Sequence, residues 1–209
     1  MRALIRCLPL SLRHIEEMMA ERSVFVDHAT VHRWSIKILP VLAAMFRRRK
    51  RPVGTSWRMD ETYIKVCGEW KYLYRAVDRA GDTIDFSLRA HRDVAAARQF
   101  FQGAIDLHGV PEKITVDKSA CNTAAIQSIR DDSGVDIELR QSKYLNNLVE
   151  QDHRAIKRIA RPMLGLKTFR CARAVIAGIE TMHMIKKGRL QCPDGQASSA
   201  ADKFYSLAF

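Results

Sequence analysis

The hydrophobic pattern of this chain changes period once, near Trp57, and the change separates two kinds of secondary structure. Before it, apolar residues recur every three or four positions, as they do on one face of a helix. After it, three stretches rich in aromatic and β-branched residues alternate in character, as strands do. These stretches span residues 58–66, 70–78 and 83–89. Short segments containing Gly68 and Gly81 separate them and are typical of tight hairpin turns, so the pattern predicts an antiparallel meander.

Helices and strands are expected to alternate after the meander. The expected elements are a helix over 94–107, a strand over 113–117, a helix over 124–130, a strand over 135–139 and a long helix from 147 onward. The order βββαβαβα predicts a mixed sheet with helices on both faces, which is an α/β domain of the ribonuclease H kind. A chain of 209 residues that is 47% hydrophobic can bury one such core and carry a small appendage.

The part before Trp57 predicts two short helices joined by a turn of about six residues. Ser11 and Asp27 are suitable N-caps for the two helices. Such a pair is a candidate helix-turn-helix, in which the second helix would present Thr30 and Arg33 to a groove of DNA. An ordinary helical hairpin fits the same spacing. We assign residues 1–46 to this region.

A run of consecutive cations follows the predicted helices. It consists of Arg47, Arg48, Arg49, Lys50 and Arg51. Pro52 and Gly54 close it, which predicts a solvated linker over 47–56 that lies against phosphate. The α/β domain is assigned to 57–190, and a C-terminal tail to 191–209.

The net charge of +12 is unevenly distributed along the chain. Residues 1–58 carry 12 basic and 4 acidic side chains, and residues 151–209 carry 11 and 4, whereas residues 59–150 are slightly acidic. Basic flanks around an acidic middle indicate flanks that bind a polyanion and a middle whose function needs carboxylates. A basic surface that maintains solubility is the alternative, although such surfaces usually mix both signs.

The cysteines and the apolar segments indicate the cellular compartment. Five scattered cysteines without a CxxC pair argue for reduced thiols, and against a disulfide framework or a zinc site. The longest apolar run, 38–46, is too short to cross a bilayer, and the first residues do not resemble a signal peptide. We therefore expect a cytoplasmic protein that does not contact a membrane.

Three carboxylates lie at positions that neither a turn nor a solvated surface explains, so they are candidates for a chemical role. Asp60 lies inside an apolar strand, Asp117 ends a buried strand at its carboxyl end, and Glu150 begins the last predicted helix. If the two strands are neighbours, all three can converge. Their hard oxygen ligands favour Mg²⁺ or Mn²⁺, and a pair of such ions can activate a nucleophile for attack on a phosphodiester.

Both Asp60 and Glu150 also have structural explanations. Asp60 would fit a surface position near a strand end, and Asn147 with Glu150 matches a helix capping box. The residues after Glu150 favour the functional interpretation, because one helix face carries the acid and then a row of cations. These cations are Arg154, Lys157, Arg158 and Arg161. Such a row is suited to holding a DNA backbone beside a reacting phosphate.

Several long motifs follow one another in a fixed order. They are SWRMDETYIKV (56–66), WKYLYRAVD (70–78), ITVDKS (114–119), RQSKYLNNLVEQDHRAIKR (140–158), RPMLGLKTF (161–169) and GIETMHMIKKG (178–188). Over residues 11–190 the chain resembles the DDE transposases of bacterial insertion sequences, in the integrase-like group whose elements form cointegrates. The resemblance implies a ribonuclease H-like catalytic core, two divalent metal ions, and metal ligation by Asp60, Asp117 and Glu150.

The resemblance also implies a function and partners. It implies cleavage of DNA at transposon ends and strand transfer into target DNA, with Lys157 contacting the transposon end. The helix-turn-helix would bind the terminal inverted repeats. Pairing of two ends implies a homodimer or a higher oligomer on double-stranded DNA.

Two positions depart from the family pattern. Relatives carry a further segment before the helix-turn-helix, so we expect this chain to be shortened at its start. Relatives also have glycine where this chain has Ala120, followed by Cys121, and the loss of a glycine there is expected to strain the loop after Asp117. A DNA-binding regulator or inhibitor of transposition, which occupies the ends without cutting them, is the alternative function.

Overall fold

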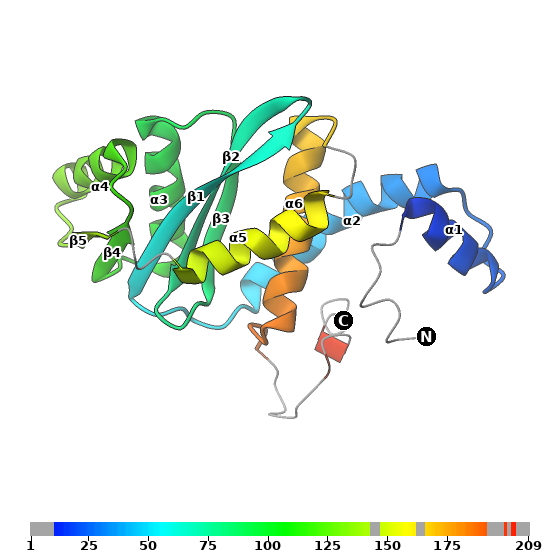
Figure 1. Cartoon of the computed structure of the whole chain (residues 1–209). Coiled ribbons are helices and arrows are strands. Elements are labelled where there is room, and N and C mark those ends of the chain that lie inside the picture. The colour runs from blue at the N-terminus through cyan, green and yellow to red at the C-terminus, as the bar shows by residue number, and fades with distance from the viewer. Residues whose placement is uncertain (1–10, 143–146, 162–165, 192–198, 200–201, 204–209) are drawn as a thin grey trace.

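The computed structural model describes residues 11–142, 147–161, 166–191, 199 and 202–203, so most of the predicted tail and the first ten residues lie outside the described part. The elements follow one another along the chain as helices, a meander, and alternating helices and strands (Figure 1). They are α1 (Leu12–Ala20), α2 (His28–Arg48), β1 (Ser56–Val66), β2 (Glu69–Asp78), β3 (Thr83–Arg89), α3 (Val94–His108), β4 (Lys113–Val116), α4 (Ala120–Ser133), β5 (Glu138–Gln141), α5 (Asn147–Ala160) and α6 (Phe169–Lys186).

The strands form one mixed sheet in the order β3-β2-β1-β4-β5. β1, β2 and β3 are antiparallel neighbours, and β4 and β5 continue the sheet parallel to β1. This confirms the predicted α/β class and the ribonuclease H-like arrangement of a meander followed by parallel strands. β1 is central, yet its pairing with β4 covers only Ser56, Trp57 and Arg58. The remaining length of β1 therefore extends past β4.

Different helices cover the two faces of the sheet (Figure 1). Because side chains alternate along a strand, Met59 faces one side of β1 and Ile64 faces the other. Met59 belongs to a large apolar core with Phe100 and Phe101 of α3 and Ile126 of α4. Ile64 belongs to a smaller apolar cluster that includes residues of α5 and α6.

The N-terminal part has the expected helices, but the second helix is longer than predicted. Asp27 caps it by accepting a hydrogen bond of 2.8 Å from the backbone N–H of Thr30. Instead of a short helix, α2 is a 21-residue helix that continues through Pro40 to Arg48. Pro40 removes one backbone hydrogen bond, and packing of α2 on α6 compensates for that loss. The helix-turn-helix itself stays a prediction, because a second helix of this length is also compatible with a helical hairpin that does not bind DNA.

The predicted linker contains ordered structure at both of its ends. Arg47 and Arg48 form the last turn of α2, so the helix passes the boundary predicted at residue 46. Phe46 is fully buried against residues of α6 and Leu190. Lys50 forms an isolated antiparallel bridge with Leu190, which joins this segment to the chain that leaves α6.

Three further elements differ from the sequence prediction. α4 begins at Ala120, four residues before the predicted start, and β5 lies at Glu138–Gln141, later than predicted. The single long helix expected after residue 147 is two helices, α5 and α6. Pro162 follows α5 in the sequence, and proline cannot continue a helix without losing a backbone hydrogen bond. In the described part, no helix has the length and apolar character needed to cross a membrane.

Candidate active site

Asp60 lies in the middle of β1, on the face covered by α5 and α6. Its side chain is about 20% exposed. Burial, together with the nearby negative charges of Glu61, Asp117 and Glu150, raises the pKa of Asp60 to about 7. A carboxyl group that is buried beside other negative charges binds either a proton or a cation. Asp60 therefore lies where negative charge is in excess.

Asp117 and Glu150 reach the same region from other elements. Asp117 directly follows β4, and its Oδ1 accepts a hydrogen bond of 3.1 Å from the backbone N–H of Ser119. Glu150 lies in the first turn of α5, is exposed, and has its Oε2 3.6 Å from Nη2 of Arg154. Because both acids act on the pKa of Asp60, the fold brings the three predicted residues within electrostatic range of one another.

The three carboxylates do not form a closed chelating site. Among the described residues, no group of three or more histidine, cysteine or acidic side chains is close enough to hold a metal ion. The donors are nevertheless all carboxylate oxygens, and burial together with their mutual repulsion raises the pKa of Asp60. This donor chemistry fits a hard divalent cation such as Mg²⁺ or Mn²⁺.

Glu61 is an acidic residue of the site that the sequence reasoning missed. It faces the side of β1 opposite to Asp60, where it forms an ion pair with Arg92. Nδ2 of Asn122 donates a hydrogen bond to Glu61 at 2.9 Å, and Nη2 of Arg92 lies 3.9 Å from Oδ2 of Asp117. Arg92 and Asn122 therefore link Glu61 to Asp117. Two consecutive acids in a strand were the available signal, since neighbouring residues face opposite sides.

His153 is a second missed residue. It lies on α5 three positions after Glu150, so the two share a helix face. It is buried, and its Nε2 lies 3.6 Å from Oδ2 of Asp60. Burial, with the positive charges of Arg75 and Lys157, lowers the pKa of His153 to about 3. The imidazole next to Asp60 is therefore neutral at physiological pH.

Buried charges connect α5 to the sheet and to α6. Arg75 of β2, paired with Asp60 across the strands, is fully buried and forms ion pairs with Asp152 of α5 and Glu180 of α6. Nη1 of Arg75 lies 3.1 Å from Oδ2 of Asp152, and Nζ of Lys187 lies 2.8 Å from Oδ1 of the same residue. We call Arg75, Asp152 and Glu180 the buried ion cluster. Because Asp152 is two residues from Glu150, the cluster anchors the start of α5.

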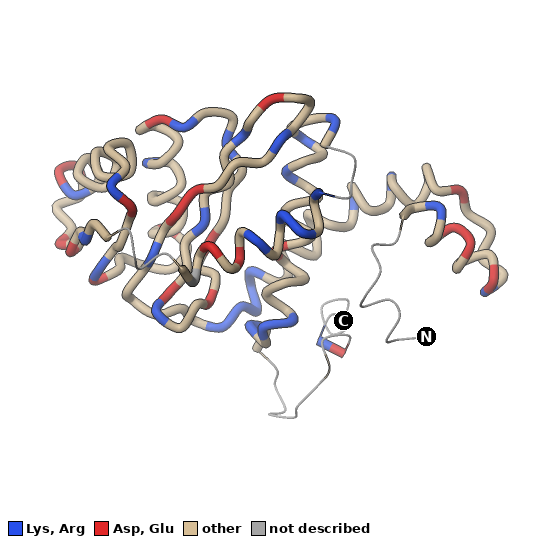
Figure 2. The backbone as a smooth tube through the Cα atoms, in the orientation of Figure 1, with Lys and Arg blue, Asp and Glu red and all other residues tan. Residues whose placement is uncertain are grey.

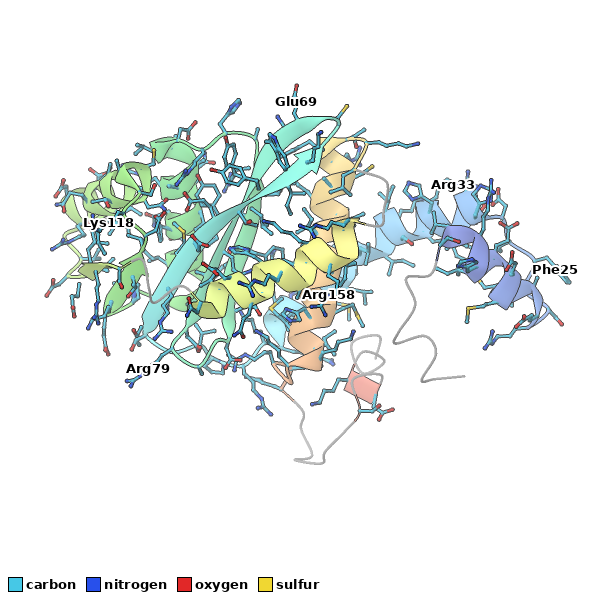
Figure 3. The ribbon with its side chains drawn as sticks, in the orientation of Figure 1. Phe25, Arg33, Glu69, Arg79, Lys118 and Arg158 are labelled. Atoms are coloured by element: carbon cyan, nitrogen blue, oxygen red, sulfur yellow. The ribbon has the colours of Figure 1, made fainter. Side chains whose placement is uncertain are left out.

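Most of the predicted DNA-binding residues are exposed. Figure 2 shows positive residues along α5 beyond its acidic start and around the end of α2, and Figure 3 shows Arg33 on the projecting part of α2 and Arg158 on α5. The exposed members are Arg33, Arg47, Arg48, Arg49, Arg51, Arg154, Arg158 and Arg161. Lys157 and Thr30 are half-buried, and the Thr30 hydroxyl accepts a hydrogen bond of 2.6 Å from Arg33.

Lys50 does not fit the predicted role of a phosphate contact in a solvated linker. Its side chain is directed into the protein, where Nζ donates a hydrogen bond to the backbone carbonyl of Ile84. Burial lowers the pKa of Lys50 to about 8. The bridge to Leu190 explains this orientation, because alternate side chains of a paired extended segment face opposite sides.

The loop after Asp117 is not strained by the absence of glycine. Ala120 is the first residue of α4, and Ser119 precedes it in extended conformation. Ala120 is not among the described residues that have positive φ. A helical residue does not need glycine, so the expected strain at this position is wrong.

Comparison with known proteins identifies the family of this chain. Residues 54–189 match a family model described as a DDE domain. The transposase for the insertion sequence-like element IS431mec of Staphylococcus aureus is 37% identical over 179 residues, covering 85% of this chain and 79% of the relative. The chain belongs to the DDE transposase family. It is a transposase of an insertion sequence, and family membership implies DNA cleavage and strand transfer.

Other similar proteins include a second staphylococcal transposase and viral integrases. The transposase of IS257 in transposon Tn4003 of Staphylococcus aureus has the same identity and the same coverage of both chains. The catalytic core domain of HTLV-2 integrase, determined with magnesium, is 18% identical with a TM-score of 0.49, over 74% of this DDE transposase and 99% of the integrase core. The BIV integrase core has 16% identity and a TM-score of 0.47, over 74% and 96% of the two chains.

Proposed function

We propose that this transposase carries out metal-dependent cleavage at transposon ends, followed by strand transfer into target DNA, with Asp60, Asp117 and Glu150 as the metal ligands. The observation that supports this assignment is the convergence of carboxylates from β1, from the end of β4 and from α5, whose charges add to the effect of burial in raising the pKa of Asp60. Carboxylates gathered in this way need a cation to remain ionised together. Two Mg²⁺ or Mn²⁺ ions are expected.

The residues around the three acids have separate roles in the proposed reaction. When bound, divalent ions would activate the attacking oxygen and stabilise the leaving oxygen of the phosphodiester. Asp60, Asp117 and Glu150 act as ligands and not as general bases. The neutral imidazole of His153 and the buried ion cluster hold Asp60 and α5 in place. Water attacks first and leaves a 3′-hydroxyl at the transposon end, and this hydroxyl then attacks a target phosphodiester.

The proposed partners are two kinds of double-stranded DNA and further copies of the chain. Terminal inverted repeats would contact Thr30 and Arg33 and the exposed arginines at the end of α2. The cations of α5 would hold the backbone beside the carboxylates, because phosphate contacts position DNA without reading its sequence. A homodimer or a higher oligomer would pair two ends. The cytoplasmic location stays a prediction.

Substitutions that keep the shape of the acids test the metal ligands. We expect Asp60→Asn and Glu150→Gln to abolish Mg²⁺-dependent strand transfer of a duplex carrying the element's own ends, and to leave binding of that duplex nearly unchanged. Asp136→Asn is the matched control, because Asp136 is an exposed acid in the loop before β5. Joining that persists in the Glu150→Gln protein contradicts the assignment. A wild-type protein that shifts the DNA without nicking it supports the regulator.

Exchanging an oxygen ligand for sulfur tests the metal directly. Thiolates are soft ligands that Mg²⁺ binds poorly and softer ions bind better. We expect Asp117→Cys to be inactive with Mg²⁺ and partly active with Mn²⁺, as measured by strand transfer at equal ion concentrations. Equal loss of activity with both ions would show that Asp117 acts in another way.

A further inference from the structure

A groove of about 650 Å³ lies beside the part of β1 that extends past β4, between the β1–β2 hairpin and α5. Its lining combines aromatic and cationic side chains. The residues that matter here are Tyr63, Trp70, Tyr72, Lys157 and Arg161. None of the described lining residues is acidic. This composition differs from both apolar cores of the domain.

The aromatic wall is unusually exposed for its size. Trp70 is 60% exposed and Tyr63 is 45% exposed, although their burial would be favourable. The two rings stand edge to face with centroids 6.4 Å apart, and the rings of Tyr63 and Tyr72 lie 5.3 Å apart. Nζ of Lys65 lies 5.8 Å from the Trp70 ring. The wall is thus an ordered group of rings that remains accessible to a flat partner.

The cationic wall comes from the end of α5 and the residue that follows it. Lys157 lies in the last turn of α5, and Arg161 directly follows the helix. A ligand that satisfies both walls must offer flat rings to Trp70 and Tyr63 and negative charge to the cations. A DNA strand with unpaired nucleotides does both, because its bases expose their faces and its phosphates are charged. In a duplex the base faces are covered by stacking, so a duplex satisfies only the cations.

The groove is continuous with the proposed active site. Tyr63 follows Glu61 by two residues of β1, so its side chain lies on the side that carries Glu61, opposite to Asp60, and the groove reaches both sides around the edge of β1 that extends past β4. Lys157 follows Glu150 by seven residues of a helix, which is about 10 Å. Nη1 of Arg92 donates a hydrogen bond of 3.5 Å to the Tyr63 hydroxyl, and Arg92 also pairs with Glu61. The cationic wall therefore begins on the helix that carries Glu150, and the aromatic wall is linked through Arg92 to Asp117, whose Oδ2 lies 3.9 Å from Nη2 of Arg92.

We propose that this groove binds unpaired nucleotides of a DNA strand next to the reacting phosphate, with bases stacked on Trp70 and Tyr63 and phosphates held by Lys157 and Arg161. The proposal rests on the proposed function, since it needs DNA at the carboxylates. It adds a site for single-stranded DNA to a protein whose other cations suit any DNA backbone. Opening of the duplex near the cut would be stabilised by this contact.

The test compares two DNA probes in the Asp60→Asn background with EDTA present, so that binding is measured without cleavage. One probe is a duplex, and the other is the same duplex with a short single-stranded thymidine tail. We expect Trp70→Ala to weaken binding of the tailed probe about tenfold and binding of the duplex less than about twofold. Trp70→Phe is the matched control, and because it keeps a ring it should retain most of the affinity.

Several outcomes overturn the proposal. Equal weakening of both probes by Trp70→Ala, or no weakening, means that the groove does not recognise unpaired bases. A change in sedimentation of the free protein with Trp70→Ala, without an effect on the tailed probe, identifies the groove as a contact between copies. Thermal melting verifies that each variant is folded. A failure of the proposed function can be told apart from a failure of this proposal. The former would appear as strand transfer that survives Asp60→Asn, and the latter appears only in the binding assay.

Discussion

The two faces of the sheet differ in the kinds of side chain that are buried against them. On the face covered by α3 and α4 there is a large apolar core, in which Phe100, Phe101 and Ile126 pack with Met59, and the contacts of Glu61 with Arg92 and Asn122 are also on this face. On the face covered by α5 and α6, the apolar cluster is smaller, and the fully buried Arg75 lies beside it. The proposed metal ligand Glu150 belongs to the second face.

This difference indicates that one face mainly stabilises the domain and the other mainly positions α5. Apolar packing is non-directional, so a core of this kind stabilises the domain and tolerates small changes of geometry. A buried ion cluster contributes little net stability, but removing one partner leaves an uncompensated charge. The cluster therefore favours one placement of α5, which is the helix that must present Glu150 to Asp60.

The largest effect is expected from breaking the buried ion cluster. Arg75→Met leaves Asp152 and Glu180 without their shared partner, and should lower the free energy of unfolding by about 4 kcal/mol. Strand transfer should be lost even where the protein is folded, because α5 is released from the sheet. Urea denaturation and a transfer assay at low temperature measure the two effects. Full transfer by folded Arg75→Met protein would contradict the positioning role.

A triple variant provides the control for that prediction. Arg75→Met combined with Asp152→Leu and Glu180→Met replaces every member of the cluster by an apolar residue, so no buried charge of the cluster is left unpaired. We expect most of the lost stability to return, and strand transfer to stay impaired.

The second effect tests the apolar face. Ile126→Ala opens a cavity in the core above α4 and should lower the free energy of unfolding by about 3 kcal/mol. Strand transfer per folded molecule should remain near that of the wild type, because no proposed metal ligand is displaced. An activity loss comparable to that of Arg75→Met would show that the two faces are not divided in this way.

A smaller effect is expected from adding one methyl group at two helical glycines. An added Cβ at Gly178 of α6 would lie 2.9 Å from Cδ2 of Leu39 of α2, whereas at Gly103 of α3 nothing lies within 4 Å. Gly178→Ala should therefore destabilise by about 1 kcal/mol through overpacking. Gly103→Ala should stabilise by about 0.5 kcal/mol through helix propensity. Thermal melting of both variants measures the difference, and equal shifts would contradict close α2–α6 packing.

The smallest effect concerns pH on the α3 side of the domain. Burial, together with the charges of Lys50 and Arg47, lowers the pKa of His108 to about 4. A histidine whose folded pKa is lower contributes stability that is present above its unfolded pKa of about 6.5. That stability is lost as the pH falls from about 6.5 towards 4. His108→Gln should flatten the pH dependence of the melting temperature in this window, and an unchanged slope would contradict the pKa shift.

Local patterns allowed much of the fold to be predicted. The meander followed from period-two alternation and from the turns at Gly68 and Gly81, and the start of α2 from the cap at Asp27. The length of α2 could not be predicted, because Pro40 disfavours a helix locally and only packing on α6 offsets that cost. The inward direction of Lys50 depends on Leu190, which is 140 residues away in the sequence.

The site, too, depends on contacts between residues far apart in the sequence, which local patterns do not reveal. Asp60, Asp117 and Glu150 could be selected because each stood at a position where an acid was unexpected or where strands end. Arg75 could not, because an arginine in a strand is ordinarily a surface residue, and its partners Asp152 and Glu180 come from helices much later in the chain. Long-range charge pairing of this kind has no local signature.

The continuity of α2 has a mechanical consequence. Its second half is packed on α6, and its first half projects from the domain together with α1 (Figure 1). Because one continuous helix joins the two halves, the tip of the arm reorients only when α2 bends, and Pro40, which lacks one backbone hydrogen bond, is the position where bending costs least. A DNA molecule that touched both the tip and the carboxylates would therefore be connected through a helix that can follow the DNA only by bending near Pro40.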